Sequence, residues 1–210
     1  MNSQTHQETA AKIIAPLWSA ALPSYRADGA QVSHLRHLFE TEWTAGLPLP
    51  LAEHRPVDQT VALADEANFH RETDESRLDI AYRQRPRTRV YESIDVRSDG
   101  WYSLVAARMA SLTRRRVICT MYESNAADQN IGAHFDLWFG VIIQMRGAKT
   151  WKIRKSPRGD TEEIVTRAGD VLLLPPHVQH DVATPEYSVH LVFAITGNPM
   201  ATNTLSGKSA

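Results

Sequence analysis

This sequence has little cysteine, little net charge and no long apolar run. It contains a single cysteine, Cys119, so an intrachain disulfide is excluded and a reducing compartment is favoured. Lysine and arginine (23) nearly balance aspartate and glutamate (24), and the net charge of −1 gives no reason to expect nucleic acid or an anionic membrane. No apolar run approaches the roughly 20 residues that span a bilayer. We therefore expect a cytoplasmic protein with neither a nucleic-acid nor a membrane partner.

Length and composition indicate one globular domain. With 210 residues, of which 42% are hydrophobic and 22% charged, the chain can bury a sizeable core. We expect a single domain over residues 11–197, in which helices and loops (11–115) precede a core of strands (116–197). Residues 1–10 and 198–210 are expected to be loose tails. The composition leaves a homodimer open.

Helical patterns occur at three places before the strands. Residues 12–22 are apolar, but the stretch is short and holds Pro16, so an amphipathic helix is favoured over a signal sequence. Apolar residues recur at helical spacing in residues 32–46 and again in residues 102–112. The residues that set these spacings, and that we expect to face the core, are Val32, Leu35, Leu38, Phe39 and Trp43 in the second stretch and Leu104, Val105, Met109 and Leu112 in the third.

The segment from His70 to Arg89 is dense in charge and poor in core residues. Long polar segments in compact domains are often either functional loops or disordered. This segment is therefore predicted to be a mobile lid over the mouth of the core or a disordered loop, and its sequence fits both.

Two potential metal ligands, His134 and Asp136, lie two residues apart between apolar residues. About 0.5 such triplets are expected by chance in a chain of this composition, so the triplet alone is weak evidence. In extended backbone, however, residues two apart point to the same face. One strand end could thus supply two ligands.

The third ligand must come from elsewhere, and His180 is the candidate. It follows a run, residues 169–176, that reads as a turn, a buried strand and a stop at two prolines. His177 in the same bend is the rival, although a solvated loop histidine is the favoured interpretation for it. Two histidines and one aspartate on a six-coordinate Fe(II) would leave three positions open, as oxidative chemistry requires.

The stretch from residue 116 to residue 196 resembles the JmjC-type 2-oxoglutarate oxygenases, and the ribosomal oxygenases and the asparaginyl hydroxylase of the hypoxia factor most closely. The residues that carry this resemblance are His134 and Asp136, then Gln144, Gly147 and Lys149, then Gly169, Asp170, Pro175, Pro176 and His180. The resemblance implies a mainly β fold, a double-stranded β-helix of the cupin or jelly-roll type, with the N-terminal helices packed outside.

The resemblance also implies a reaction. Fe(II) bound by His134, Asp136 and His180 would use dioxygen and 2-oxoglutarate, which is converted to succinate and CO2 while a substrate carbon is hydroxylated. Lys149 would bind the far carboxylate of 2-oxoglutarate, because a lysine in an apolar strand is costly to bury without a partner. A lysine at an edge strand that reaches solvent is the alternative. Thr120 and Tyr122 share a strand face, and their hydroxyls could bind the same carboxylate.

Departures from the family pattern occur at Thr120, Gly140 and His177, where relatives often carry asparagine, asparagine and glycine. They affect the finer cosubstrate contacts and leave the three ligands untouched. On the last strand, alternation places His190 on the inner face, where a hydrogen-bonded core histidine is favoured over a fourth ligand. The aromatic candidates for substrate contact are Trp101, Tyr102 and Trp138, although large aromatic residues more often belong to the core.

Three functions remain open at this point. The first is a dioxygenase that hydroxylates an unactivated carbon, on a side chain of a peptide or protein (histidine among the candidates) or on a peptide natural product. The second is a metal-dependent cupin that isomerises or cleaves a small molecule without oxygen. The third is a metal-binding cupin without catalysis. Asp136 and Lys149 favour the first over the second, because many metal-dependent cupins use three histidines and a glutamate. The complete set of three ligands argues against the third.

Overall fold

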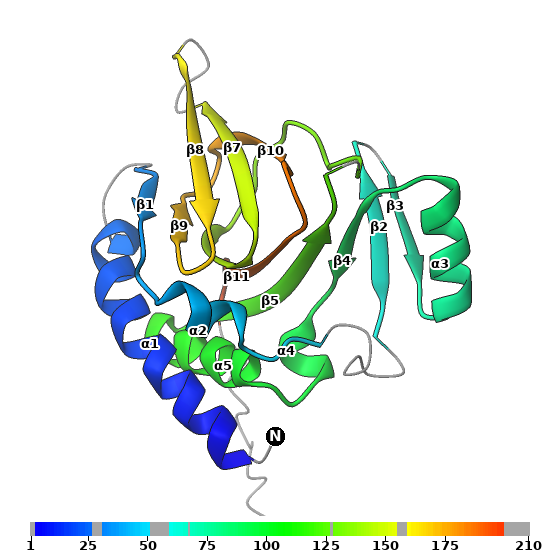
Figure 1. Cartoon of the computed structure of the whole chain (residues 1–210). Helices are drawn as coiled ribbons and strands as arrows, with labels where there is room; N and C mark the ends of the chain where they lie inside the picture. The colour runs from blue at the N-terminus through cyan, green and yellow to red at the C-terminus, as the bar shows by residue number, and fades with distance from the viewer. Residues whose placement is uncertain are drawn as a thin grey trace, which may run out of the picture.

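The computed structural model describes residues 3–26, 31–50, 59–66, 68–126, 128–154 and 159–199. In these residues two antiparallel sheets face each other (Figure 1). The larger sheet has the order β1-β9-β6-β11-β5-β4-β2-β3, and the smaller has the order β10-β7-β8. The strands are β1 (Ser33–Leu35), β2 (Val61–Asp65), β3 (Asn68–Glu72), β4 (Thr88–Tyr91), β5 (Arg115–Ser124), β6 (Phe139–Arg146), β7 (Ala148–Arg154), β8 (Thr161–Arg167), β9 (Val171–Leu174), β10 (Gln179–Ala183) and β11 (Ser188–Pro199). The predicted double-stranded β-helix is confirmed.

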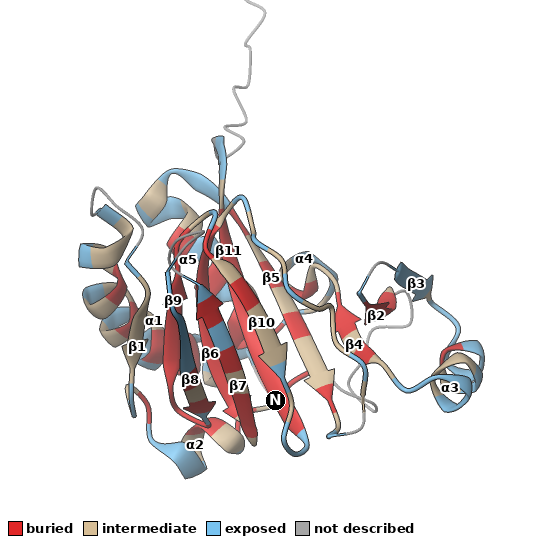
Figure 2. Cartoon of the chain, turned by 90° about the horizontal axis from the view of Figure 1, so that it is seen from above, coloured by how far each residue is buried: buried red, intermediate tan, exposed pale blue. Residues whose placement is uncertain are grey.

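The central strands of the larger sheet are apolar on both faces because both faces are covered. In β11, Leu191 and Phe193 belong to the core under the helices, whereas Val192 between them packs toward the smaller sheet. In β6, Val141 and Ile142 divide in the same way. A strand buried on both sides shows no polar alternation. Figure 2 shows this burial running along the central strands.

Two long helices cover the outer face of the larger sheet, as predicted. They are α1 (Ser3–Arg26) and α5 (Trp101–Thr113), which pack on each other and on the sheet (Figure 1). The helix expected over residues 12–22 is confirmed, but it begins at Ser3, so the prediction of a loose tail is wrong for residues 3–10. Buried Thr9 and Ala10 extend the apolar face of α1 and explain the earlier start. None of the described helices is long and apolar enough to cross a lipid bilayer.

The single helix predicted over residues 32–46 is wrong. Ser33–Leu35 form β1, which pairs with β9 at the edge of the larger sheet, and only α2 (Thr41–Ala45) is helical. Strand pairing outweighs the helical spacing here, because the sheet edge offers β1 backbone partners. In α5 the inward positions are Val105 and Met109, whereas Leu104 and Leu112, predicted to face inward, are exposed.

The prediction of a polar loop or lid from His70 to Arg89 is also wrong. The segment forms the end of β3, then α3 (Glu75–Gln84), then the start of β4, while the short α4 (Ile94–Arg97) follows it. The carboxylate of Asp74 caps α3 by accepting from the amide of Arg77. Figure 1 shows α3 beyond β3, at the edge of the larger sheet and away from the smaller one.

The tight turn between β6 and β7 requires a glycine. Gly147 has φ +60, and a Cβ atom there would lie 1.8 Å from the carbonyl oxygen of Tyr187. This turn starts the strand that carries Lys149, which accounts physically for the glycine two residues before that lysine.

Replacement of Gly147 by alanine is expected to lower the free energy of unfolding by roughly 2–4 kcal/mol, because the side chain adds both backbone strain and a clash. Urea denaturation measures the change. Gly197→Ala is the matched control, since no heavy atom lies within 4 Å of the added methyl group. Equal stability of the two variants would contradict this account of the turn.

Candidate metal centre

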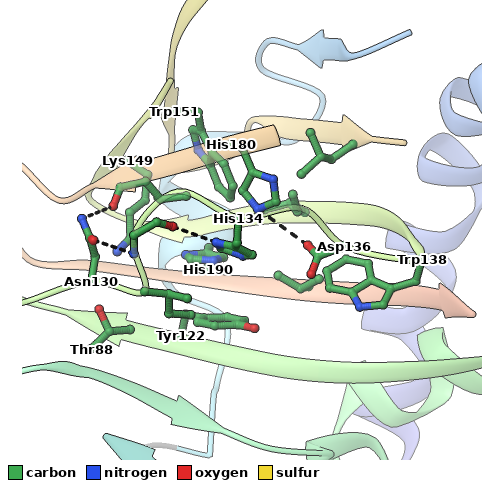
Figure 3. Close-up of a pocket in the computed structure, with 16 residues that line it drawn as sticks. Thr88, Tyr122, Asn130, His134, Asp136, Trp138, Lys149, Trp151, His180 and His190 are labelled. Atoms are coloured by element: carbon green, nitrogen blue, oxygen red, sulfur yellow. Dashed lines mark hydrogen bonds and ion pairs between the residues drawn. The ribbon is translucent and has the colours of Figure 1, made fainter. Parts of the chain in front are cut away.

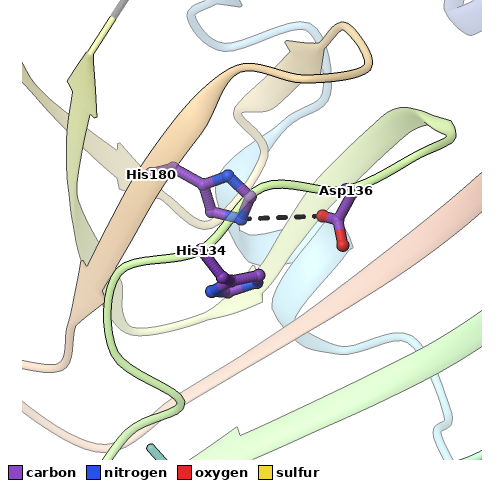
Figure 4. Close-up of side chains that lie close together, drawn as sticks. All are labelled: His134, Asp136 and His180. Carbon is purple, nitrogen blue, oxygen red and sulfur yellow. Dashed lines mark ion pairs between the residues drawn. The ribbon is translucent and has the colours of Figure 1, made fainter. Parts of the chain in front are cut away.

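Three side chains from separate parts of the chain meet at one end of the space between the sheets. His134 and Asp136 lie in the loop between β5 and β6, and His180 lies in β10. One potential ligand atom from each lies within 4.8 Å of the others, and Nε2 of His180 is 3.6 Å from Oδ2 of Asp136 (Figure 4). The three residues singled out in the sequence are therefore brought together and could hold a metal ion.

The backbone sets the two histidines opposite each other. They form an isolated antiparallel bridge, in which the amide of His134 donates to the carbonyl of His180 over 2.9 Å. The amide of His180 donates back to the carbonyl of His134 over 2.8 Å. Side chains paired in this way stand on the same face of the ladder. The imidazoles consequently lie side by side, with ring centroids 4.3 Å apart.

Each imidazole is oriented by a backbone carbonyl two residues earlier in the chain. Nδ1 of His134 is 2.8 Å from the carbonyl oxygen of Gly132, and Nδ1 of His180 is 3.0 Å from that of Val178. A carbonyl oxygen only accepts, so each Nδ1 carries the proton and donates it. Each Nε2 keeps its lone pair, which is the arrangement found in metal-binding histidines.

Burial changes the pKa values of His180 and Asp136. It lowers the pKa of His180 to about 4, so the imidazole is neutral and able to bind a metal at neutral pH. Burial also raises the pKa of the Asp136 carboxyl, an effect that the neighbouring His134 opposes. A divalent cation would offset the cost of keeping this carboxylate charged, so the donor set fits a metal.

His177 is exposed and does not join the three ligands. Its ring packs near Phe135, and its backbone amide donates to the carbonyl of Asp136 over 2.8 Å. His177 has φ 65, the left-handed conformation that favours glycine. The bend thus holds the loop of Asp136 in place through its backbone.

A pocket extends from the three ligands to Lys149 on β7 (Figure 3). Lys149 is 2% exposed, and its ammonium donates to Oγ of Ser124 over 2.8 Å and to Oγ1 of Thr184 over 2.5 Å. Among the described residues, no carboxylate forms an ion pair with it. Burial lowers the pKa of Lys149 to about 8, which measures the cost of leaving this cation unpaired. Lys152, predicted to face solvent, is exposed.

The hydroxyl groups that accept hydrogen bonds from Lys149 are those of Ser124 and Thr184. Thr120 and Tyr122, which were predicted to bind the far carboxylate, lie four and two residues before Ser124 on β5. Four strand residues span about 13 Å, so Thr120 is too far from Lys149 and does not line the pocket. Tyr122 does line it, but Figure 3 shows its hydroxyl turned toward Trp138 and away from Lys149.

The pocket wall contains further residues that the sequence did not single out. Thr88 comes from β4, and Asn130 lies in the loop before the ligands, where its amide donates to the carbonyl of Val182. Trp138, a predicted candidate for substrate contact, also lines the pocket. The other two candidates, Trp101 and Tyr102, are buried in the core under the helices and take no part in the site.

Comparison with known proteins agrees with this geometry. Residues 89–203 match the JmjC domain, and no curated protein matches the sequence. A structure of YcfD, a ribosomal oxygenase from Escherichia coli, is similar with a TM-score of 0.57 at 16% identity, over 89% of this chain and 52% of that chain.

Two complexes of YcfD are similar to the same degree. The complex with cobalt and 2-oxoglutarate has a TM-score of 0.60 at 15% identity, and the complex with cobalt and succinic acid has 0.58 at 17%. Each match covers 89% of this chain and 52% of the other, so the chain spans about half the length of these structures. At this identity the likeness concerns the fold. The JmjC match covers more than half of the residues and includes His134, Asp136, His180 and Lys149, and the chain therefore belongs to the JmjC domain family.

Proposed function

We propose that this protein is an Fe(II)- and 2-oxoglutarate-dependent oxygenase that hydroxylates an unactivated carbon. The observation that carries the proposal is the buried ammonium of Lys149, which shares one pocket with a three-ligand metal centre and has no carboxylate partner among the described residues. A dicarboxylate that binds the metal at one end and Lys149 at the other would complete the coordination of the metal and pair the buried ammonium.

The roles follow from the geometry. His134, Asp136 and His180 would hold Fe(II) through two imidazole nitrogens and a carboxylate oxygen, leaving positions open for a chelating oxoacid and dioxygen. When bound, the iron would supply the oxidative step, in which 2-oxoglutarate loses its 1-carboxylate as CO2, one atom of dioxygen enters succinate and the other hydroxylates the substrate carbon. The protein positions the reactants and excludes water.

The far carboxylate would be bound by a cation and two hydroxyls. The ammonium of Lys149 donates three hydrogens, and Ser124 and Thr184 take two of them. The third remains for the ligand. A charge-assisted hydrogen bond in this buried site is strong because little water competes with it.

The substrate we propose is a side chain in a peptide or protein, with histidine among the candidates, or a peptide natural product. The similarity in fold to a ribosomal oxygenase supports a protein substrate. The exposed residues beside Asp136 are Phe135 and Leu137, so the surface next to the metal centre is apolar. A reducing compartment such as the cytoplasm suits both ferrous iron and the free thiol of Cys119.

Succinate formation tests the proposal. Purified protein supplied with Fe(II), ascorbate and 2-oxoglutarate is expected to form succinate slowly without substrate, because these oxygenases turn over in an uncoupled manner. The reaction must stop when oxygen is removed. Turnover of a small molecule under strict anaerobiosis, with no succinate formed in air, would instead support a cupin isomerase or lyase.

The stability of the protein should depend on pH through Lys149. Its pKa is about 8 in the folded state against the ordinary 10.5, so between these values the unfolded state binds more protons and stability rises with pH. Relative to a Lys149→Met variant, the wild type should gain about 3 kcal/mol of unfolding free energy from pH 8 to pH 10.5. Urea denaturation of both proteins over this range, without 2-oxoglutarate, measures the difference. A constant difference would show that burial does not penalise this ammonium.

A further inference from the structure

His190 is a buried polar residue in the pocket wall whose ring has no hydrogen-bond partner among the described residues. Its side chain is 4% exposed, it lines the pocket, and Nδ1 is enclosed without a partner. The hydrogen-bonded core histidine that the sequence favours is therefore not what the structure contains. An unpaired polar group of this kind costs roughly 1–3 kcal/mol, so its presence calls for a compensating interaction.

Two aromatic rings fix the orientation of the imidazole. Tyr122 stacks on one face with an interplanar angle of 2° and a centroid distance of 4.8 Å. Trp151 meets the ring edge to face at 5.6 Å, and its indole nitrogen already donates to Thr166. A change in the plane of the His190 ring would break both contacts. A partner for Nε2 must therefore come from the pocket.

The strand register places His190 two residues along β11 from the position opposite Ser124, which contacts Lys149. In the pairing of β11 with β5, Ser188 is opposite Ser124, the residue that accepts from Lys149. His190 is opposite Tyr122, two residues and about 7 Å further along the same face. Figure 3 shows its ring between the labelled Lys149 and Asp136.

The imidazole is a neutral hydrogen-bond donor toward the pocket. Burial and the nearby charge of Lys149 lower its pKa well below the ordinary value, so the ring carries one proton. Nδ1 is enclosed away from any partner. Since unpaired buried N–H groups are rarer than unpaired acceptors, the proton belongs on Nε2, the nitrogen left for the pocket.

We propose that His190 is a cosubstrate-binding residue, which donates a hydrogen bond from Nε2 to an oxygen of the far carboxylate of 2-oxoglutarate, beside Lys149. The inference rests on the proposed function and adds a recognition element to it. The far carboxylate would thus be bound by a neutral donor, His190 on β11, as well as by a cation, Lys149 on β7. The bound dicarboxylate would be the partner of Nε2, whereas Nδ1 stays enclosed without a partner.

Binding measurements without turnover test this inference. The protein is loaded with Mn(II), and titration calorimetry gives the dissociation constants of 2-oxoglutarate and succinate for the wild type, His190→Phe and His190→Gln. Phenylalanine keeps the stacked ring and removes the donor, whereas the amide nitrogen of glutamine can reach the place of Nε2. Both ligands carry the far carboxylate, so His190→Phe should weaken both by roughly tenfold to hundredfold. His190→Gln should restore part of the affinity.

Thermal unfolding without ligand separates binding from folding. His190→Phe should melt at the wild-type temperature or above it, because it removes an unpaired buried polar group. Wild-type affinity of His190→Phe for both ligands would overturn the inference. Weakened binding of 2-oxoglutarate with unchanged binding of succinate would overturn the assignment to the far carboxylate. If His190→Phe does not fold, His190→Leu replaces it in the same comparison.

Measurements on the wild type distinguish a failure of this inference from a failure of the proposed function. If the wild type binds no 2-oxoglutarate and forms no succinate, the proposed function fails. If the wild type binds 2-oxoglutarate and His190→Phe binds it equally well, only the role of His190 fails.

Discussion

Replacement of His180 by alanine is expected to abolish stoichiometric binding of iron and to reduce succinate formation at least about a hundredfold. Loss of a direct ligand should exceed the 10- to 100-fold effect of losing a group that only orients a ligand. Iron content after anaerobic reconstitution and the rate of uncoupled succinate formation measure the two effects. Asp136→Ala should give the same result. Because Asp136 is less buried than His180, its replacement is less disruptive, and loss of iron there would not be explained by misfolding.

The matched control for this experiment is His177→Ala. His177 lies in the same bend as His180 but is exposed and outside the three ligands. Its contact with Asp136 uses the backbone amide, which alanine retains. This variant should bind iron normally. Loss of iron from His177→Ala, with iron kept by His180→Ala, would exchange the roles of the two histidines.

Replacement of Lys149 by methionine is expected to weaken 2-oxoglutarate binding by roughly a hundredfold or more. Removing one partner of a buried, hydrogen-bonded charge pair commonly costs 2–5 kcal/mol, about 30-fold to several thousandfold in affinity. Calorimetry on the Mn(II)-loaded protein measures the dissociation constant. Without 2-oxoglutarate the variant should be at least as stable as the wild type, because methionine fills the space of an unpaired buried cation.

Lys152→Met is the control on the same strand. Lys152 is exposed on the opposite face of β7, so this change removes the same charge without touching the pocket. Its affinity for 2-oxoglutarate should be unchanged. Equal losses in the two variants would indicate a long-range effect of charge and would remove Lys149 as the binding group.

The sequence predicted the metal centre better than it predicted the binding site for the far carboxylate. Residues two apart in extended backbone share a face, and this rule placed His134 beside Asp136. The turn, the buried strand and the two prolines before His180 pointed to it as the third ligand, and the resemblance to the JmjC family supported the choice, although no local rule gives the pairing of His180 with the loop before β6. The three residues meet as expected.

The rule of alternation did not identify the hydroxyl groups that contact Lys149. It predicts on which face of a strand a residue lies and not how far along the strand it lies. Thr120, Tyr122 and Ser124 alternate along one face of β5, and of their three hydroxyl groups only that of Ser124 accepts a hydrogen bond from Lys149. The same alternation could have pointed to Ser124 as a third candidate. Thr184 gives no such signal, since its position depends on how β10 pairs with β7.

The two largest errors in the fold have a common cause. In residues 32–46 and 70–89 the sequence suggested a helix and a loop, whereas both stretches contribute strands at the edges of the larger sheet. Edge strands are short and partly exposed, so they lack the apolar run that marks β6 or β11. The partner of β1 is β9, far along the chain, which local patterns do not report, whereas β3 pairs with the neighbouring β2.

Hydrogen exchange at the backbone amides of His134 and His180 can report on the metal centre. Each of the two amides donates to the carbonyl of the other residue, and these two hydrogen bonds join the loop before β6 to β10. A metal bound between the imidazoles would cross-link the same two segments and slow their separation. These two protons should therefore exchange together, and more slowly once iron is loaded, while protons in α3 keep their rate.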